Sequence, residues 1–412
     1  MTKWSRVRIP LSALIMKEQL KELLKSAAKL TKDTALLLRP LTKKEKWDLK
    51  RLSEHLNQKE LKQVTNAIRQ KKARIQLRRL GFSFLISGKD LVPALLSKEN
   101  EIRALNDKIE REFYEARFEE FSTRAWDALP QYIAPNIIGL IPTKQAAILQ
   151  LFTSEPLHIL MLGDPGTGKT DILHSVKRLA SIASFGLGSG TSGAGLSVTV
   201  KGKRVSKGLL PMADGGLCCI DELSLMKKED RAGLLNAMEK GFVSYDKGGE
   251  HYQFDARIRL LATANPKEDK FKSYKLAQLK KQLPFDAALL TRFHLVFFVK
   301  KASLKQFAEI AEKIISEDKE NVKPADLDFI KRYIQHTKDL DVKLPNHLTR
   351  QVKNFAMVLK ARERRLPYTI TPRTVKGIIA LAKASARLEM RNEIQTKDLD
   401  RVFGIFKSAV EI

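Results

Sequence analysis

The chain has 412 residues, of which 43% are hydrophobic, so it can build two or three domains with apolar cores and is too apolar for global disorder. Its formal net charge of +28 favours a polyanionic partner, either nucleic acid or an anionic surface. No apolar run approaches the roughly 20 residues of a membrane span, and the first residues lack the apolar core of a signal peptide. We therefore expect a soluble intracellular protein without a membrane partner, cytoplasmic and nucleoid-associated or nuclear.

Residues 1–125 are predicted to form a basic, mainly α-helical domain. Residues 1–80 hold 22 Lys and Arg against 7 Asp and Glu, which is more than half of the excess charge. Apolar residues recur at helical spacing over 20–30 and 52–68, and "FSFLIS" is typical of a short strand. The cations of "RQKKARIQLRRLGF" form either a solvated helix face or a phosphate-binding surface, and their lack of acidic neighbours favours the latter.

Residues 126–300 are predicted to form a three-layer α/β/α domain, after a proline-containing boundary in "DALPQYIAPNIIGL". The strand-like runs "HILML", "GLCCID", "IRLLATAN" and "HLVFFV" alternate with helical stretches, which is typical of a mostly parallel sheet. Residues 301–412 carry only helical patterns and are predicted to form a helical lid. The two cysteines, Cys218 and Cys219, fall within a strand-like run, and we expect small buried hydrophobic residues there.

The stretch "ILMLGDPGTGKT" fits the phosphate-binding pattern G-x-x-x-x-G-K-[ST]. Glycine permits backbone conformations in which successive N–H groups converge on one anion, and the following helix adds its positive N-terminal end. Lys169 is expected to reach the β- and γ-phosphates of ATP, and the Thr170 hydroxyl to ligate Mg²⁺. The residues expected to contact the nucleotide are Gly163, Asp164, Pro165, Gly166, Thr167, Gly168, Lys169, Thr170 and Asp171.

Three further signals fit ATP hydrolysis. The apolar run of "GGLCCIDEL" ends in two carboxylates, and we assign Asp221 to the metal and Glu222 to the attacking water. Asn265 ends the strand-like "RLLATAN", where its amide can reach the γ-phosphate or that water. Arg292 precedes the strand-like "HLVFF" and either stabilises the charge of phosphoryl transfer, supplied by a neighbouring subunit, or forms a surface salt bridge.

These motifs in this order resemble the AAA+ ATPases, and over about 130–412 the chain resembles the minichromosome-maintenance (MCM) replicative helicases. The strings that carry the resemblance include "IAPNIIGL", "GDPGTGKT", "TSGAGLSVTV", "ADGGLCCIDEL", "KEDRAGLLNAME", "ATANPK" and "LLTRF". The resemblance implies a hexameric ring that hydrolyses ATP with Mg²⁺ between subunits. It makes Gly163–Thr170 the Walker A motif, Asp221–Glu222 the Walker B motif and Asn265 sensor 1. It also makes Arg292 the trans-acting arginine finger, and Arg373 in "ITPRTV" the sensor 2 arginine of the lid.

The resemblance further implies two hairpins that grip single-stranded or duplex DNA. "GLSVTVKGKRVSKGLLPMADGG" resembles the helix-2 insert of the family, with Lys201, Lys203 and Arg204 at or near its tip. "GFVSYDKGGEHYQF" resembles the presensor-1 hairpin, with Lys247 at the position of the family's DNA-gripping lysine. Both stretches place glycine-containing, positively charged tips between β-prone arms, so ordinary solvated hairpins are the alternative.

Some residues depart from the family pattern. Gly168, Lys169 and Thr170 stand where MCM proteins usually have Ala-Lys-Ser, and His294 replaces an aspartate. The helix-2 insert is shorter than usual, and residues 1–125 resemble neither the zinc ribbon nor the oligonucleotide-binding barrel of the family. We also expect that the family's carboxyl-terminal winged helix is missing. The sequence thus resembles a reduced or divergent MCM protein acting as an ATP-driven DNA motor. The alternatives are a magnesium-chelatase-like ATPase that remodels a protein partner and a monomeric, helicase-derived paralogue.

Overall fold

The computed structural model describes residues 36–40, 82–86, 114–201, 204–247, 250–315 and 324–411. The chain divides into two compact units, Met1–Phe121 and Ser122–Ile412. In the first unit, β1 (Leu36–Pro40) pairs antiparallel with β2 (Phe82–Ile86), the strand predicted from "FSFLIS". The basic cluster and the helices predicted before residue 114 lie outside the described residues, so a helical domain over 1–125 stays a prediction.

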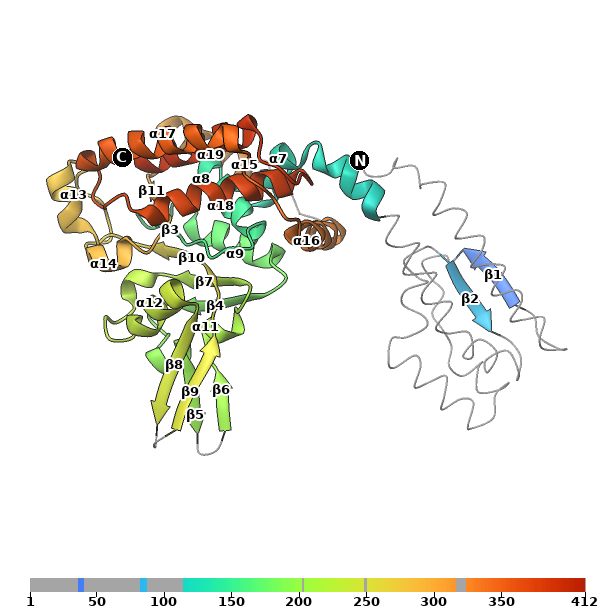
Figure 1. Cartoon of the computed structure of the whole chain (residues 1–412), viewed down its shortest axis with the longest axis horizontal. Helices are drawn as coiled ribbons and strands as arrows, with labels where there is room; N and C mark the ends of the chain where they lie inside the picture. The colour runs from blue at the N-terminus through green and yellow to red at the C-terminus, as the bar shows by residue number, and fades with distance from the viewer. Residues whose placement is uncertain are drawn as a thin grey trace. The chain divides into compact units, whose positions relative to one another are not determined.

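A five-stranded parallel sheet forms the centre of the second unit, in the order β11-β3-β10-β7-β4 (Figure 1). Four of these strands confirm the predicted apolar runs, which read as continuous because both faces of the sheet are covered. The exception is β4, whose Ser184 and Gly186 interrupt the apolar pattern at the edge of the sheet. The strands are β3 (Ile159–Gly163), β4 (Ala183–Leu187), β7 (Leu217–Asp221), β10 (Arg259–Ala264) and β11 (Leu295–Val299).

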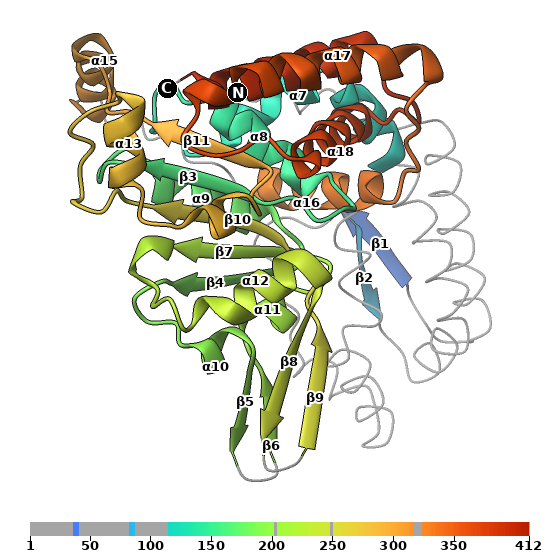
Figure 2. The same cartoon turned by 60° about the vertical axis from the view of Figure 1, so that its left-hand side comes forward.

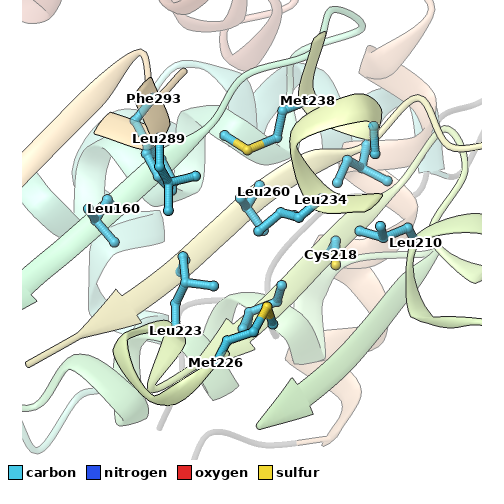
Figure 3. Packing of buried hydrophobic residues seen from close by; sticks show 14 of the residues in the cluster. Leu160, Leu210, Cys218, Leu223, Met226, Leu234, Met238, Leu260, Leu289 and Phe293 are labelled. Atoms are coloured by element: carbon cyan, nitrogen blue, oxygen red, sulfur yellow. The ribbon is translucent and has the colours of Figure 1, made fainter. Parts of the chain in front are cut away.

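Alternate residues of each strand enter different hydrophobic layers, because side chains alternate across a sheet. One layer packs against α12 (Arg231–Lys240), whose Leu234 and Met238 lie over the sheet (Figure 3). Its strand residues include Leu160, Cys218 and Leu260. The intervening strand residues face the layer of α9 (Lys169–Leu179), against which α8 (Ile141–Leu151) packs. Both cysteines are buried and unpaired, as predicted.

The predicted lid is helical in the residues that the structure describes. It packs on the core through contacts of α18 with α8 and of α19 with β11. The Arg387 guanidinium donates a hydrogen bond of 3.3 Å to the carbonyl oxygen of Phe152, which ties the lid to the core. The helices after β11 are α15 (Leu304–Ile315), α16 (Pro324–Lys338), α17 (Asn346–Arg362), α18 (Pro372–Leu388) and α19 (Thr396–Val410).

Short helices connect the larger elements. Within the described ranges, no helix combines the length and the apolar character that crossing a membrane requires. The short helices are α7 (Ala125–Ala128), η2 (Leu129–Tyr132), α10 (Gly193–Leu196), α11 (Leu209–Met212), η3 (Leu223–Leu225), α13 (Leu276–Gln282), α14 (Ala287–Leu290) and η4 (Glu363–Arg365).

Two antiparallel hairpins leave the core on the side away from the lid (Figures 1 and 2). The strands β5 and β6 form the first, and the strands β8 and β9 form the second. The hairpins lie side by side, and β5 contacts β8. Their strands are β5 (Val198–Lys201), β6 (Arg204–Lys207), β8 (Phe242–Lys247) and β9 (Glu250–Asp255).

Candidate nucleotide site and its partner surface

The glycine-rich loop joins the end of β3 to the start of α9. Gly163 pairs with Val299 of β11, and a Cβ at position 163 would come within 2.2 Å of the Val299 carbonyl oxygen. Gly166 and Gly168 have φ angles of +73° and +81°, which residues with a side chain rarely adopt. A Cβ on Gly168 would also meet the side chain of Ile137 at 2.9 Å. Close packing and left-handed backbone therefore explain the glycines of the motif.

Lys169 opens α9 and turns its side chain back over the loop. Its buried ammonium donates hydrogen bonds to the carbonyl oxygens of Gly163 at 2.8 Å and of Asp164 at 2.6 Å, and to the Thr167 hydroxyl at 3.2 Å. Burial lowers the pKa of Lys169 to about 8, and the nearby charge of Asp164 opposes that shift. The sequence therefore places a buried cation at the phosphate loop, where anionic phosphates would compensate its desolvation.

Asp164 is buried and holds the loop against neighbouring segments at the carboxyl end of the sheet. Its Oδ1 accepts a hydrogen bond of 2.8 Å from the backbone N–H of Phe271, and its Oδ2 lies 3.9 Å from the ammonium of Lys301. By contrast, Pro165 and Asp171 are exposed. Asp164 thus has a structural task within the loop, and nucleotide contacts by Pro165 and Asp171 stay a prediction.

The predicted acids lie beside the loop at the carboxyl end of β7. Asp221 is the last residue of that strand and is 6% exposed. Its Oδ1 accepts a hydrogen bond of 3.2 Å from the Thr170 hydroxyl, so the two predicted metal ligands lie together. A hydroxyl and a carboxylate are oxygen donors of the kind that Mg²⁺ takes beside phosphates, so the pair fits that ion. Glu222 follows with a φ of 53°, an uncommon backbone conformation outside glycine.

The strand β10 lies between β3 and β7, and its last residues lie at the same carboxyl end of the sheet. Asn265 follows β10 directly, and its backbone N–H donates a hydrogen bond of 3.2 Å to the Ser224 hydroxyl beyond β7. Sequence reasoning missed Thr263, which is 2% exposed and whose hydroxyl contacts Asp221 and Glu222. A threonine in a strand is common, and only the register of β10 beside β7 brings its hydroxyl to Asp221.

Arg292 and Arg373 lie together, although 81 positions separate them in the sequence. The Arg292 guanidinium forms an ion pair of 2.8 Å with Glu239 at the end of α12 and donates a hydrogen bond of 2.6 Å to the Ala288 carbonyl. Arg373 donates a hydrogen bond of 3.0 Å to the carbonyl of Thr291. Burial lowers the pKa of Arg373, and the positive charge of Arg292 lowers it further. The predicted salt bridge of Arg292 therefore exists and holds the guanidinium beside a second cation.

Two cavities adjoin this cluster of Arg292, Arg373 and Lys376. The first has a volume of 390 Å³ and is lined by all three cations and by Glu239. The second has a volume of 430 Å³ and shares Arg373, Lys376 and Glu239 with the first. Sequence reasoning missed Lys376, which follows Arg373 at helical spacing on the same side of α18. The cluster holds three cations against one carboxylate, so it suits an anionic ligand.

His294 anchors the lid beside these cations. Its Nδ1 accepts a hydrogen bond of 3.0 Å from the backbone N–H of His158, and its own backbone N–H donates to the His158 carbonyl at 2.9 Å. A Cβ on Gly377 of α18 would come within 3.0 Å of the His294 Cβ, so the lid helix packs tightly there. Burial lowers the pKa of His294, and the charges of His158 and Arg373 lower it further. The residue that departs from the family pattern is thus a buried, neutral packing residue.

The predicted DNA-contact residues fall on the two hairpins. Lys201 ends β5 and pairs with Arg204, the first residue of β6, whereas Lys203 lies outside the described residues. Lys247 ends β8 and pairs with Glu250 of β9. Both hairpins thus place basic residues at their far ends, as the sequence predicts. DNA contact itself stays a prediction.

A parallel sheet with a glycine-rich phosphate loop after β3, acids after β7 and a helical lid defines a P-loop nucleotide-binding fold of the α/β class. Two family models match the chain, one for the MCM P-loop domain over residues 115–318 and one for the MCM AAA-lid domain over residues 328–410. The chain belongs to the minichromosome-maintenance (MCM) family.

Similar proteins come from archaea and eukaryotes. A minichromosome maintenance protein MCM of Saccharolobus solfataricus is 28% identical over 347 residues, which cover 78% of this chain and 50% of that protein. The DNA replication licensing factor MCM5 of Arabidopsis thaliana is 31% identical over 67% of this chain and 43% of its own length. The DNA replication licensing factor mcm7 of Schizosaccharomyces pombe is 29% identical over 69% and 42%, respectively. The chain therefore spans about half the length of these relatives.

Proposed function

We propose that this chain hydrolyses ATP with Mg²⁺ at the interfaces between its own copies in a hexameric ring, and that hydrolysis drives movement along DNA. One observation carries the proposal. The residues for binding and hydrolysis, Lys169, Asp221 and Glu222, lie at the carboxyl end of the parallel sheet. Arg292 precedes β11, whose first residue is in register with the first residue of β3, so Arg292 lies at the amino end.

The two ends of a five-residue strand are about 15 Å apart, so the phosphates bound at the loop are out of reach of Arg292 of the same chain. Arg292, Arg373 and Lys376 instead form a cationic surface without the acids and loop that hydrolysis needs. A neighbouring copy that presents its loop to this surface would complete the site. Each copy in a closed ring then contributes one half of two different sites.

The side chains of the loop end have distinct roles in the proposed reaction. Lys169 binds the β- and γ-phosphates, while backbone N–H groups of the loop surround them. Glu222 orients and deprotonates the attacking water, and the Asn265 amide holds that water or the γ-phosphate. Thr170 and Asp221 would hold Mg²⁺, which neutralises charge on the phosphate oxygens. Arg292 and Arg373 of the neighbouring copy stabilise the charge that develops during transfer.

DNA is proposed as the polymer on which the ring moves. The hairpins β5–β6 and β8–β9 project together, with Lys201 and Lys247 at their far ends (Figure 2). Cations presented at the same place by every copy of a ring would line its channel and contact a phosphate backbone. Relatives named as DNA replication licensing factors support this assignment. A protein that moves on DNA would be located in the nucleus or at the nucleoid. The basic residues of 1–80 would add non-specific affinity for DNA.

The trans arrangement is tested by mixing two inactive variants. Glu222→Gln damages only the loop half of the site, and Arg292→Ala damages only the cationic half. Each variant alone should lose nearly all ATPase activity. Co-expression in equal amounts should restore up to about a quarter of the parent activity, because random assembly joins two intact halves at that fraction of interfaces. The control pair is Glu222→Gln with Lys169→Ala, which damage the same half and should restore nothing.

A mixture that recovers no activity, or an Arg292→Ala variant that hydrolyses ATP at the parent rate, would contradict the shared site. The DNA part of the proposal has its own test. Single-stranded DNA should stimulate the parent ATPase, and its binding should weaken steeply with salt because phosphate contacts release counterions. Indifference to DNA would instead support a remodelling ATPase that acts on a protein partner.

A further inference from the structure

Thr263 joins the two acidic residues through one hydroxyl group. It is the fifth residue of β10, between the strand of the phosphate loop and the strand of the acids. Its Oγ1 donates a hydrogen bond to the Asp221 Oδ1 and accepts one of 2.9 Å from the backbone N–H of Glu222. A hydroxyl has one donor and can serve both bonds at once. A single buried side chain therefore contacts both residues of the acidic pair.

The bond to Asp221 fixes the orientation of its carboxylate. The Asp221 Oδ1 accepts hydrogen bonds from Thr263 and from Thr170, the latter at 3.2 Å. Both donors act on the same oxygen, so neither of them engages Oδ2. Because Thr263 is β-branched and 2% exposed, its χ1 angle has little freedom and its hydroxyl direction is set by the strand. The strand β10 thus determines which carboxylate oxygen is held inside the protein.

The bond to Glu222 supports an unfavourable backbone conformation. Glu222 has a φ of 53°, in the left-handed region that non-glycine residues avoid. Its N–H is bonded to Thr263, and its carbonyl accepts a hydrogen bond of 2.9 Å from the N–H of Leu225. A second link, from the Asn265 N–H to the Ser224 hydroxyl, joins the same two segments. The turn after β7 is therefore held to the end of β10 on both sides of Glu222.

We propose that Thr263 is a positioning residue for this site, one that orients Asp221 toward the metal and Glu222 toward the attacking water. This inference rests on the proposed function, because the acids are taken to serve ATP hydrolysis. Thr263 acts through these two acidic residues, because its hydroxyl is bonded to both of them. Its loss should therefore weaken the metal-dependent part of nucleotide binding and the chemical step, and should leave the phosphate loop intact.

The test compares Thr263→Val, which keeps the shape and removes the hydroxyl, with Thr263→Ser, which keeps the hydroxyl. The matched control is Thr337→Val in the lid, where the same change removes a buried hydroxyl that bonds to the Tyr333 carbonyl. We expect Thr263→Val to lower kcat and the affinity for Mg²⁺ about 10- to 100-fold, as is typical when a partner of a metal ligand is removed. Thr263→Ser and Thr337→Val should stay close to the parent.

Binding of a fluorescent ATP analogue supplies a readout that does not depend on turnover. In EDTA, the parent and Thr263→Val should bind the analogue within about two-fold of each other. With Mg²⁺, Thr263→Val should bind the analogue more weakly than the parent, by the same factor as its decrease in Mg²⁺ affinity. Parent-like Mg²⁺ dependence of Thr263→Val would overturn the proposal. Equal losses in Thr263→Ser, or equal losses with and without Mg²⁺, would also overturn it.

Two outcomes separate this proposal from the proposed function. If the parent binds nucleotide with Mg²⁺ but never hydrolyses it, the ATPase assignment fails, and the binding comparison still decides the role of Thr263. If Thr263→Val does not fold, Thr263→Ala and Thr263→Ser form the pair for the same measurements. A Thr263→Ala variant with the Mg²⁺ dependence of Thr263→Ser would then refute the positioning role.

Discussion

Arg373 of the lid donates a hydrogen bond of 3.0 Å to the carbonyl oxygen of Thr291, the residue that precedes Arg292. This bond links the first turn of α18 to the segment before β11, and it places two guanidinium groups beside the same cavity. The position of Arg373 therefore depends on the docking of the lid, and the position of Arg292 depends on the core segment before β11. A site completed by a neighbouring copy would sense the contact between lid and core.

Removal of the lid arginine should act on chemistry more than on nucleotide binding. We expect Arg373→Ala to lower kcat about 100-fold, because a charge-assisted donor to the transferring phosphate is removed. The affinity for nucleotide should change little if the phosphate loop of the neighbouring copy does the binding. Arg364→Ala, at an exposed arginine of the lid, is the control and should retain parent kinetics. Steady-state ATPase assays with DNA present would measure kcat and the apparent affinity for ATP of each variant. A normal kcat of Arg373→Ala would exclude Arg373 from the reaction.

Two helical glycines of the lid should respond oppositely to the same substitution. Nothing lies within 4 Å of a Cβ built on Gly404 of α19, so Gly404→Ala should raise the free energy of unfolding by about 0.5–1 kcal/mol. At Gly377 the new methyl group would stand 3.0 Å from the His294 Cβ, and the packed neighbour must shift. We therefore expect Gly377→Ala to lower the free energy of unfolding by about 1 kcal/mol. Urea denaturation of both full-length variants gives the comparison, and an equal gain at both positions would refute the tight contact.

Stability should fall between pH 6.5 and pH 4 because His158 is buried and neutral. Its Nε2–H faces the Met238 carbonyl, its Nδ1 accepts from the Leu260 N–H at 3.3 Å, and burial lowers its pKa to about 4. Between pH 6.5 and pH 4, His158 is protonated in the unfolded chain and neutral in the folded chain. The free energy of unfolding therefore decreases as the pH falls. The loss reaches about 3 kcal/mol over this window. The buried His294 shifts in the same direction and adds to the loss.

The histidine effect is measured by denaturation at several pH values. His158→Gln removes the titration while keeping donor and acceptor atoms, and its stability should depend less on pH. His347→Gln, at an exposed histidine, serves as the control and should follow the parent curve. If His158→Gln keeps the full slope between pH 6.5 and pH 4, another group controls the acid sensitivity.

The hairpin lysine should contribute to DNA binding through charge. We expect Lys247→Ala to weaken binding to DNA of any sequence and to lower the slope of log affinity against log salt by about 1 for each phosphate that the lysine neutralises in the parent. Nucleotide binding without DNA should be unaffected. Lys353→Ala, an exposed lysine on α17, removes the same charge from the lid and is the control. An unchanged salt slope for Lys247→Ala would remove the β8–β9 hairpin from the DNA-binding surface.

The loop end of the site could be predicted because its signals are local in the sequence. Lys169 and Thr170 come shortly after one apolar strand and Asp221 ends another, and parallel strands bring their carboxyl ends to the same end of the sheet. Their meeting then follows from topology, and the Thr170–Asp221 hydrogen bond agrees with it. The edge strand β4 was harder to predict, since Ser184 and Gly186 weaken its apolar pattern.

The contributions of Thr263 and Lys376 could not be read from the sequence. Thr263 follows a common preference of β-branched residues for strands, and only its register beside β7 reveals the contact with Asp221. Lys376 looks like one more cation on a basic helix until α18 docks against His294. In both cases the signal arises from tertiary packing between distant segments, which local pattern and charge do not encode.

The placement of β10 in the middle of the sheet couples accurate folding to the geometry of the proposed site. Ala262 of β10 is in register with Ile220 of β7, which brings the next residue of each strand, Thr263 and Asp221, to the same face. A shift of one position would turn the hydroxyl toward the apolar layer under α12 and leave the carboxylate without its donor. A misaligned conformer would therefore lose stability and the proposed activity together, because one strand register sets both.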